Sequence, residues 1–381
     1  MSRGQPRPTP GPELRPTRLE VDLRAVRANV TRLRELAGAE VCAVVKADGY
    51  GHGAVPVARA AVDGGARWLA VALVEEGIAL REAGVDVPIL LLTEPPVAAI
   101  GELIAARLTP TVYRAPFMAA LEAMGHQRDH AIDVHVKLDT GMGRVGIPPE
   151  LWRERLEQVA VARRLRVTGL YTHLARADEL SVGTTAEQLA AFRRGRDVAA
   201  KLGLRPRWLH VANTAGALAH PEARLDLVRP GIGVYGLSPG ADVDAAEHGL
   251  RPALRLVTEI AFAKRISAGT PVSYGHRWRA PEDGWLAVLP LGYGDGMPRA
   301  LTNRAQVLLR GRRHPVVGTV CMDQVLVWCA EVEPTVGEPV VLLGAQGDEQ
   351  VRVEEWAAAA DTITYEIVTQ LTARLPRHHH G

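Results

Sequence analysis

Short apolar runs alternate with longer amphipathic segments between residues 18 and 236, and this alternation constrains the fold more than any other feature of the sequence. Each run is rich in aliphatic residues, and a segment of helical length separates it from the next. Runs that are apolar along their whole length are typical of parallel strands covered on both faces. We therefore expect eight parallel strands, at residues 41–45, 68–73, 88–92, 109–113, 132–138, 167–173, 208–211 and 225–228.

Eight strand–helix units in roughly 220 residues predict a (β/α)8 TIM barrel. The expected helices include one capped by Asp22 and four at 74–83, 98–107, 150–164 and 186–201. A doubly wound parallel sheet has the same alternation, and periodicity alone does not show that a sheet closes. The predicted fold class is α/β, with the closed barrel preferred over the open sheet.

The pattern changes after residue 250, where Gly and Pro instead of long helices separate the apolar runs. This pattern predicts a second, mostly antiparallel β domain with helices only near its end, at 353–360 and 365–375. The strands of this domain are expected at 254–266, 271–278, 285–291, 305–309, 315–330 and 339–343.

The expected domain organisation has four parts. Residues 1–16 contain five prolines and no apolar segment, so they are predicted to be a disordered arm and not a signal peptide. The barrel is expected over 17–248 and the β domain over 249–376. Residues 377–381 include three histidines and are interpreted as a frayed tail, so no metal site is predicted there or elsewhere.

Composition argues against several classes of function. Lys and Arg number 45 and Asp and Glu 43, and the resulting net charge of +2 argues against general binding to nucleic acid or anionic membranes. No run of about 18 apolar residues is present, so no membrane-spanning segment is predicted. The three cysteines are too few for a disulfide scaffold and favour a reducing cytoplasm.

Lysine is rare in this arginine-rich chain, which makes its four lysines informative. A retained lysine hints at nucleophilic chemistry, because an amine can lose its proton and attack a carbonyl group. Active sites of TIM barrels lie at the C-terminal ends of the strands. The polar and glycine residues found at those predicted ends are Lys46, Lys137, Asp139, Arg144, His173, Asn213, Thr214, Arg229 and Gly231.

Two features at these ends together indicate the cofactor pyridoxal 5′-phosphate (PLP). Lys46 follows a buried strand, where desolvation lowers the pKa of an amine and favours its nucleophilic form. The turn at Gly231-Ile232 follows a late strand, where barrels commonly bind phosphate, although a plain tight turn is the alternative. Two G-x-G-x-x-G matches, at 141–146 and 231–236, run into Pro or Gly and not into a helix, so a dinucleotide site is rejected.

Residues 43–53, around Lys46, read Ala-Val-Val-Lys-Ala-Asp-Gly-Tyr-Gly-His-Gly. This segment resembles the PLP-lysine signature of the alanine racemases, PLP enzymes of the barrel type. The resemblance implies interconversion of L-alanine and D-alanine in the cytoplasm, supplying D-alanine for cell-wall peptidoglycan. It continues in family order at 137–144, 171–173, 213–214, 229–236, 272–275, 292–296, 320–324 and 363–366, and so covers residues 18–375.

The resemblance implies racemisation by two bases. Lys46 would bind PLP covalently and then act on one face of the substrate Cα, while Tyr274 would act on the other face. Tyrosine is an unusual base, with an ordinary pKa of about 10, so contacts from His173 and Arg229 would assist it. Arg229 would face the pyridine nitrogen of PLP. Because arginine keeps its proton, it would weaken the electron sink and limit transamination.

The same resemblance implies further roles. Lys137 matches the lysine that is carbamylated in many members, where it pairs with Arg144. Tyr274 and Lys46 belong to domains that meet across subunits in this family, so a homodimer with shared active sites is implied. The cofactor-binding set would be Lys46, Tyr50, Arg144, His173, Asn213, Thr214, Arg229, Gly231, Ile232 and Tyr365, and the substrate-binding set Arg144, Met322 and Asp323.

Three other functions stay open on the sequence. A PLP decarboxylase built on the same scaffold would need a carboxylate at the pyridine nitrogen, and Arg229 argues against it. A non-catalytic PLP-binding protein would need only the barrel, so the β domain with Tyr274 argues against that. An amino-acid racemase of broader specificity, acting for example on serine, is the alternative that the sequence addresses least.

Overall fold

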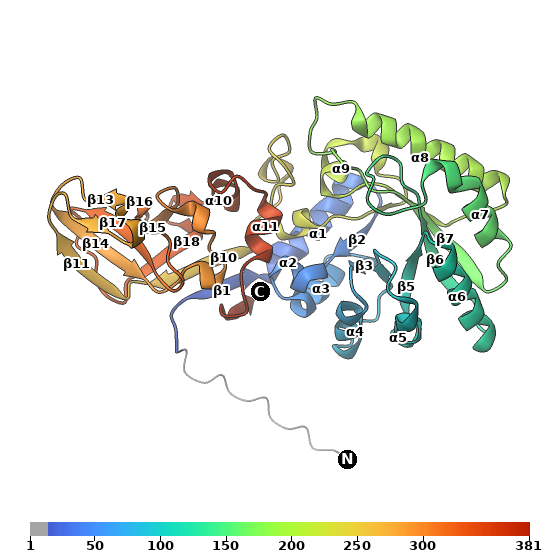
Figure 1. Ribbon diagram of the computed structural model, residues 1–381, viewed down its shortest axis with the longest axis horizontal. Helices are drawn as coiled ribbons and strands as arrows, with labels where there is room; N and C mark the ends of the chain where they lie inside the picture. The colour runs from blue at the N-terminus through green and yellow to red at the C-terminus, as the bar shows by residue number, and fades with distance from the viewer. Residues whose placement is uncertain (1–13) are drawn as a thin grey trace, which may run out of the picture. The chain divides into compact units, whose positions relative to one another are not determined.

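The computed structural model describes residues 14–381 (Figure 1). The chain folds into two compact units. The first, here called the barrel unit, comprises residues 21–253, 362–370 and 379–381. The second, here called the β unit, comprises residues 254–361 and 371–378 together with the described residues before 21.

The barrel unit is built on eight parallel strands that follow one another in chain order around a ring. The ring closes between its last two strands: the backbone N–H of Asp226 donates to the Leu209 carbonyl at 3.1 Å, and that of Arg229 donates to the Ala212 carbonyl at 2.9 Å. The predicted closed barrel is therefore confirmed over the open sheet. The strands are β2 (Glu40–Val44), β3 (Trp68–Val71), β4 (Ile89–Leu91), β5 (Leu108–Val112), β6 (Ile132–Lys137), β7 (Leu165–Tyr171), β8 (Trp208–His210) and β9 (Leu227–Val228).

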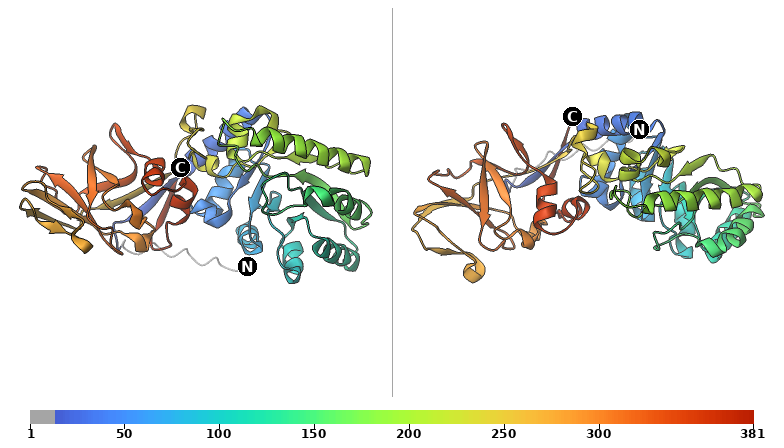
Figure 2. Two further views of the ribbon diagram at one scale, coloured as in Figure 1. Left: turned by 45° about the horizontal axis from the view of Figure 1, so that its top comes forward. Right: turned by 90° about the horizontal axis from the view of Figure 1, so that it is seen from above.

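Helices surround the strands, and Figure 2 shows the long helix α8 (Thr184–Lys201) running along their outer side. Helix α1 (Leu23–Ala37) begins where the sequence predicts, because the Asp22 carboxylate accepts the N–H groups of Arg24 and Ala25 at 2.9 and 3.4 Å. The other helices of the ring are α3 (Ala54–Asp63), α4 (Val74–Glu82), α5 (Ile100–Ala105), α6 (Ala115–Gln127), α7 (Trp152–Ala160) and α9 (Thr214–Ala219).

The β unit is mostly antiparallel, as predicted. Its main sheet has the strand order β11-β14-β17-β16-β15-β18-β10-β1-β20, and β19 pairs with β18 while β12 pairs with β13. These strands are β1 (Arg18–Asp22), β10 (Leu254–Glu259), β11 (Phe262–Ile266), β12 (Pro271–Val272), β13 (Trp278–Arg279), β14 (Gly284–Leu289), β15 (Gln306–Leu309), β16 (Arg312–Val317), β17 (Val325–Ala330), β18 (Pro339–Gln346), β19 (Glu349–Val351) and β20 (Arg377–His380).

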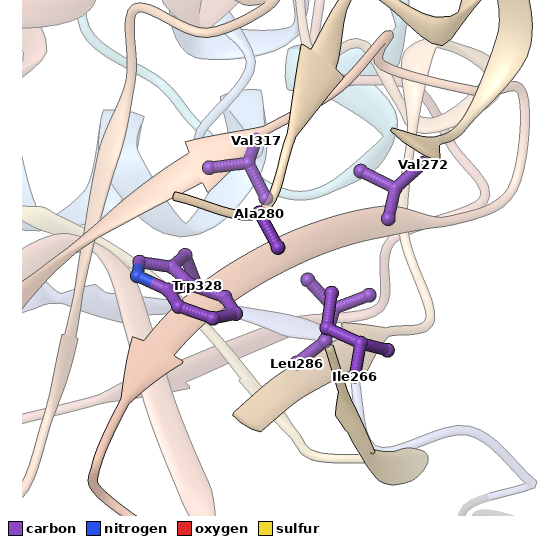
Figure 3. Packing of buried hydrophobic residues seen from close by; sticks show 6 residues of the cluster. All are labelled: Ile266, Val272, Ala280, Leu286, Val317 and Trp328. Carbon is purple, nitrogen blue, oxygen red and sulfur yellow. The ribbon is translucent and has the colours of Figure 1, made fainter. Parts of the chain in front are cut away.

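An apolar cluster fills the space between the hairpin β12–β13 and the neighbouring strands (Figure 3). Leu286 and Val317 project from the main sheet, Val272 comes from β12, and Ala280 directly follows β13. Burial of these side chains removes apolar surface from water, which stabilises the hairpin on the sheet. The remaining members of the cluster are Ile266 and Trp328.

The structure differs from the sequence-based expectation at both ends of the chain. Residues 377–380, expected to be a frayed tail, form strand β20, and the His379 Nε2 lies 2.7 Å from the His52 carbonyl oxygen. Most of the expected disordered arm, residues 1–13, lies outside the described residues. Arg15 belongs to the rest of that arm, and its guanidinium group pairs with Asp295 at 2.6 Å.

Two long runs were predicted as single strands and are each divided. Residues 254–266 form β10 and β11, and residues 315–330 contribute to β16 and β17. The second predicted C-terminal helix is also shorter, because α11 (Thr364–Thr369) ends early. No helix among residues 14–381 combines the length and the apolar character that crossing a bilayer requires.

Candidate active site

The loop that carries Lys46 has an unusual backbone. Lys46 follows strand β2 and begins the short segment α2 (Lys46–Tyr50). Three non-glycine residues of this segment have left-handed φ angles, 52° at Ala47, 52° at Asp48 and 51° at Tyr50. This conformation costs about 1–2 kcal/mol per residue in a left-handed helix, so surrounding contacts must hold it in place.

The Glu76 carboxylate supplies such contacts. Its Oε1 accepts the backbone N–H of Ala47 at 2.6 Å, and its Oε2 accepts those of Ala72 and Leu73 at 2.8 and 3.0 Å. One side chain at the start of α4 thus connects the loop after β2 with the loop after β3. Because Ala47 directly follows Lys46, these hydrogen bonds fix the direction in which the lysine leaves its strand.

Two lysine amines at the strand ends have lowered pKa values. Burial lowers the pKa of Lys46, the positive charge of Arg144 lowers it further, and the carboxylate of Glu76 opposes both. Burial, Arg229 and Arg144 lower the pKa of Lys137 to about 7. Both amines therefore lose their protons more readily than a lysine in water, which favours nucleophilic and basic behaviour.

Arg229 is almost entirely buried, with 2% of its surface exposed. Its guanidinium group donates to the Thr172 carbonyl and to His210 Nδ1, both at 2.7 Å, and to His173 Nδ1 at 3.3 Å. Since a guanidinium group has no acceptor, both Nδ1 atoms must accept, so neither carries a hydrogen. Burial, aided by Arg229, holds the pKa values of His173 and His210 well below their usual range. These neutral rings and the carbonyl fix the position of the cation.

The turn after β9 forms a cradle of hydroxyl and backbone groups. Thr214 Oγ1 accepts the N–H groups of Gly231 and Gly233 at 3.0 and 3.2 Å, which leaves its own hydrogen free to donate to a ligand. A Cβ atom on Gly231 would collide with the hydroxyl group of Tyr50, so glycine is required to keep this space open. Donors around a small open space suit a phosphate group, so the residues present fit PLP.

Other predicted cofactor residues surround this cradle. The ring of Tyr50 lies 6.0 Å from that of Tyr365 and 5.0 Å from that of Tyr235. Ile232 follows Gly231 in the turn, and Asn213 precedes Thr214 and caps α9 through the N–H of Gly216 at 2.9 Å. Tyr365 was predicted within the C-terminal β domain, but residues 362–370 belong to the barrel unit. The structure thus brings Tyr365 to the other barrel residues.

The remaining predicted residues belong to the β unit. Tyr274 lies in the hairpin loop between β12 and β13 with 74% of its surface exposed, and Met322 is 51% exposed in the loop before β17. Asp323 accepts a hydrogen bond from Arg374 at 2.6 Å. These three side chains are accessible to a partner or ligand in the β unit as it stands.

Comparison with known proteins identifies the family. A family model described as "Alanine racemase, N-terminal domain" matches residues 21–239, and one described as "Alanine racemase, C-terminal domain" matches residues 253–379. The alanine racemase of Thermobifida fusca is 44% identical over 365 residues, which cover 95% of this chain and 97% of that protein. The chain belongs to the alanine racemase family.

Solved structures of this family have the same fold. An alanine racemase from a D-cycloserine-producing Streptomyces lavendulae has a TM-score of 0.92 and 38% identity, covering 98% of each chain. An alanine racemase from Streptomyces coelicolor has a TM-score of 0.92 and 42% identity, covering 96% of this chain and 98% of that one. These comparisons confirm the predicted family and the predicted barrel with its second β domain. They also confirm the prediction of a PLP-dependent isomerase.

Sequence reasoning missed two residues that support this alanine racemase site. Glu76 binds the loop of Lys46 through backbone N–H groups, and His210 binds Arg229. A glutamate near the start of a surface helix carries no signal of such a role. His210 offered a signal, because it is a polar residue within the apolar run 208–211 of a predicted barrel strand.

Proposed function

We propose that this chain interconverts L-alanine and D-alanine with two bases, Lys46 and Tyr274, that act on opposite faces of the substrate Cα. The observation that carries this proposal is the half-buried Lys46 amine with its lowered pKa, placed at a barrel strand end that also holds Arg229 and the Thr214–Gly231 cradle. Membership of the alanine racemase family supports the substrate and the reaction.

Each barrel residue would hold one part of PLP. Thr214, Asn213, Gly231, Ile232, Tyr50 and Tyr365 would bind the phosphate group. Arg229 would face the pyridine nitrogen with His173 beside it, and Arg144 would lie near the phenolate oxygen. When bound, PLP supplies an electron acceptor that makes the Cα proton of an amino acid removable.

The two bases divide the proton transfers. The lowered pKa of Lys46 favours its neutral form, which can accept a proton from one face of Cα. Tyr274 would return a proton to the other face, so inversion needs no side chain that swings across the substrate. Met322 and Asp323 would help to hold the substrate carboxylate. Because Tyr274 would come from a second copy of the chain, the proposal includes a homodimer with two shared sites.

Arg229 supports racemisation over decarboxylation or transamination. Its guanidinium group keeps its proton, so it would leave the pyridine nitrogen of PLP without one and would weaken the electron sink. Its hydrogen bonds to Thr172 and His210, which fix the guanidinium group at the strand ends, support this role. Arg229 would in this way favour return of the proton to Cα and disfavour transamination.

Lys137 is proposed to be carbamylated and to pair with Arg144. Carbon dioxide reacts with a neutral amine, and the pKa of Lys137, lowered to about 7, makes that form abundant near neutral pH. The carbamate would carry a negative charge, which would reduce the repulsion among Lys137, Arg144 and Arg229.

In the cell, the proposed product is D-alanine for cell-wall peptidoglycan, made in the cytoplasm.

One experiment separates the candidate functions. The purified protein with PLP is incubated in D₂O with L-alanine, L-serine or L-lysine, and the products are analysed for chirality and for deuterium at Cα. We expect D-alanine carrying deuterium, and little reaction with lysine. Equal turnover of serine would indicate a broader racemase. Release of carbon dioxide without a D-product would favour a decarboxylase, and absence of any turnover a PLP-binding protein.

A further inference from the structure

Tyr274 projects from a firmly anchored hairpin. Val272 of β12 pairs with Trp278 of β13, so Tyr274 lies in the loop of residues 273–277 that joins them. Val272 is 6% exposed and belongs to the apolar cluster of the β unit (Figure 3). Trp278 packs against the same cluster. The base of the loop is therefore fixed, whereas the Tyr274 side chain is exposed.

The residue directly before Tyr274 has a strained backbone. Ser273 has φ 62° and ψ 179°, a combination that is almost restricted to glycine. The strain arises because the Cβ of an L-residue collides with neighbouring backbone atoms at this φ. A serine stays in this conformation only if other contacts hold it there.

Two side-chain hydrogen bonds connect this segment to the loop before β17. The Ser273 hydroxyl group donates to the Thr319 carbonyl at 2.6 Å, and the Thr319 hydroxyl group donates to the Tyr274 carbonyl at 2.6 Å. The thiol of Cys321 lies beside them, 3.4 Å from Ser273 Oγ. Thr319 thus accepts from Ser273 and donates to Tyr274, so one hydrogen bond holds the residue before Tyr274 and the other holds the Tyr274 carbonyl itself.

Gly318 permits this close approach. A Cβ atom at Gly318 would lie 2.8 Å from the Ser273 Cβ, and Gly318 itself has φ 72°. Its N–H donates to Asn303 Oδ1 at 2.6 Å, and the Asn303 amide donates in turn to the Arg277 carbonyl of the hairpin loop at 3.2 Å. The loop that carries Thr319, the hydrogen-bond partner of Ser273, is thus itself held in place.

We infer that Ser273 and Thr319 are positioning residues for Tyr274: their paired hydroxyl–carbonyl bonds hold a strained backbone that directs the phenol toward the substrate. This inference rests on the proposed role of Tyr274 as one of the two bases. If Ser273 relaxed to an ordinary extended φ, the Cα–Cβ bond of the next residue would turn and carry the phenol away. A displacement of about 1 Å at a reacting group can cost about 100-fold in rate.

Substitutions at Ser273 separate strain from hydrogen bonding. Ser273→Ala removes the hydroxyl group but keeps the Cβ that makes the conformation strained. Ser273→Gly removes both, and glycine adopts φ 62° without penalty. We expect Ser273→Ala to lower kcat by about 10- to 100-fold and Ser273→Gly to lower it less. If the kcat of Ser273→Ala is equal to or higher than that of Ser273→Gly, the inference is overturned.

Substitutions at Thr319 test the second bond. Thr319→Val removes the donor to the Tyr274 carbonyl at nearly constant volume, and Thr319→Ser keeps it. We expect Thr319→Val to lose about tenfold in kcat and Thr319→Ser to recover most of that loss. Thr335→Val is the matched control, because Thr335 is exposed on the same unit. If both valine variants behave alike, the hydroxyl group of Thr319 does not position Tyr274.

Deuterium exchange distinguishes positioning from general loss of structure. With alanine in D₂O, the face served by Lys46 can exchange its proton without inversion, while racemisation also needs Tyr274. For one enantiomer, the ratio of exchange to racemisation should therefore rise about tenfold in Ser273→Ala, with the visible absorption of bound PLP unchanged. A proportional fall of exchange and racemisation would overturn the inference.

Tyr274→Phe separates this inference from the proposed function. Loss of racemisation in Tyr274→Phe with full activity in Ser273→Ala and Thr319→Val would refute the positioning role alone. Unchanged racemisation in Tyr274→Phe would refute the two-base proposal and, with it, the reason for positioning Tyr274.

Discussion

The two units present their proposed bases in opposite ways. The barrel unit half-buries Lys46, where loss of hydration and the charge of Arg144 lower its pKa. The β unit exposes Tyr274, which has 74% of its surface accessible. Yet each base is next to a non-glycine residue with a positive φ, Ala47 after the lysine and Ser273 before the tyrosine. Each unit therefore orients a reactive group by holding the neighbouring backbone in an unfavourable conformation.

The two units hold that backbone by different chemistry. In the barrel unit, the carboxylate of Glu76 accepts three backbone N–H groups, one of them from Ala47. In the β unit, the hydroxyl groups of Ser273 and Thr319 donate to backbone carbonyls. A charged acceptor forms stronger hydrogen bonds but also acts on the pKa of a nearby amine, whereas hydroxyl groups act by geometry alone. The comparison predicts that substitutions will affect the two bases differently.

Replacement of Lys46 should have the largest effect. Lys46→Ala removes both the covalent attachment of PLP and one of the two bases, so we expect racemisation to fall by more than about 10⁴-fold. The visible absorption of lysine-bound PLP should also disappear. Lys201→Ala is the control, since Lys201 is exposed at the end of α8. Retention of the absorption band in Lys46→Ala would contradict the assignment.

Replacement of Tyr274 should affect turnover but not cofactor binding. Tyr274→Phe removes only the phenolic oxygen, and we expect a loss of about 10²- to 10⁴-fold in kcat, the usual contribution of one acid–base group. The absorption of bound PLP should stay as in the unsubstituted enzyme, because every proposed PLP contact belongs to the barrel unit. Loss of both properties together would break the proposed division between the units.

Replacement of Glu76 tests whether the carboxylate positions Lys46. Glu76→Gln has one good acceptor oxygen for three N–H groups, so we expect kcat to fall by about tenfold and the free energy of unfolding by about 1–3 kcal/mol. Glu75→Gln is a matched control on the same helix, because Glu75 is exposed. Similar kinetics and stability of the two variants would show that the contacts of Glu76 are dispensable.

Replacement of Lys137 should change the pH dependence of stability. Its pKa is lowered to about 7 in the folded chain but is about 10.5 when unfolded, so the unfolded chain binds more protons between these values. The stability that depends on Lys137 is therefore complete above pH 10.5 and is lost as the pH falls toward 7.

This contribution can be measured by comparing urea unfolding at pH 7 and pH 9.5 in solutions free of carbon dioxide. The gain in stability on going to pH 9.5 should be smaller in Lys137→Met than in the unsubstituted chain, by up to a few kcal/mol. An identical gain in both proteins would mean that the folded chain does not depress the pKa of Lys137.

The sequence predicted the barrel well because each strand is a local apolar pattern. The runs 41–45 and 132–138 correspond to β2 and β6 within one residue at each end. The Lys46 and Arg229 positions were also predictable, since both directly follow such runs. The β unit was harder: the run 315–330 contains two strands, and the turn between them depends on Gly318 packing against Ser273 rather than on local sequence.

The supporting contacts could not be predicted from the sequence. Glu76 lies 29 positions from Ala47 and Thr319 lies 45 from Tyr274, and nothing in the chain marks these pairs. Both contacts lie at or next to a non-glycine residue with a positive φ, Ala47 or Ser273, and the local sequence does not mark either angle. Motif patterns identify the reactive groups, whereas tertiary packing decides what holds them.

Residues 362–370 belong to the barrel unit, although in the chain they follow residues 254–361 of the β unit. During synthesis on the ribosome, the eight strands of the ring emerge long before Tyr365, which packs beside Tyr50. The cradle proposed for the cofactor phosphate can therefore be completed only near the end of translation. A nascent chain halted within the β unit would hold Lys46 but lack part of the pocket that the lysine serves.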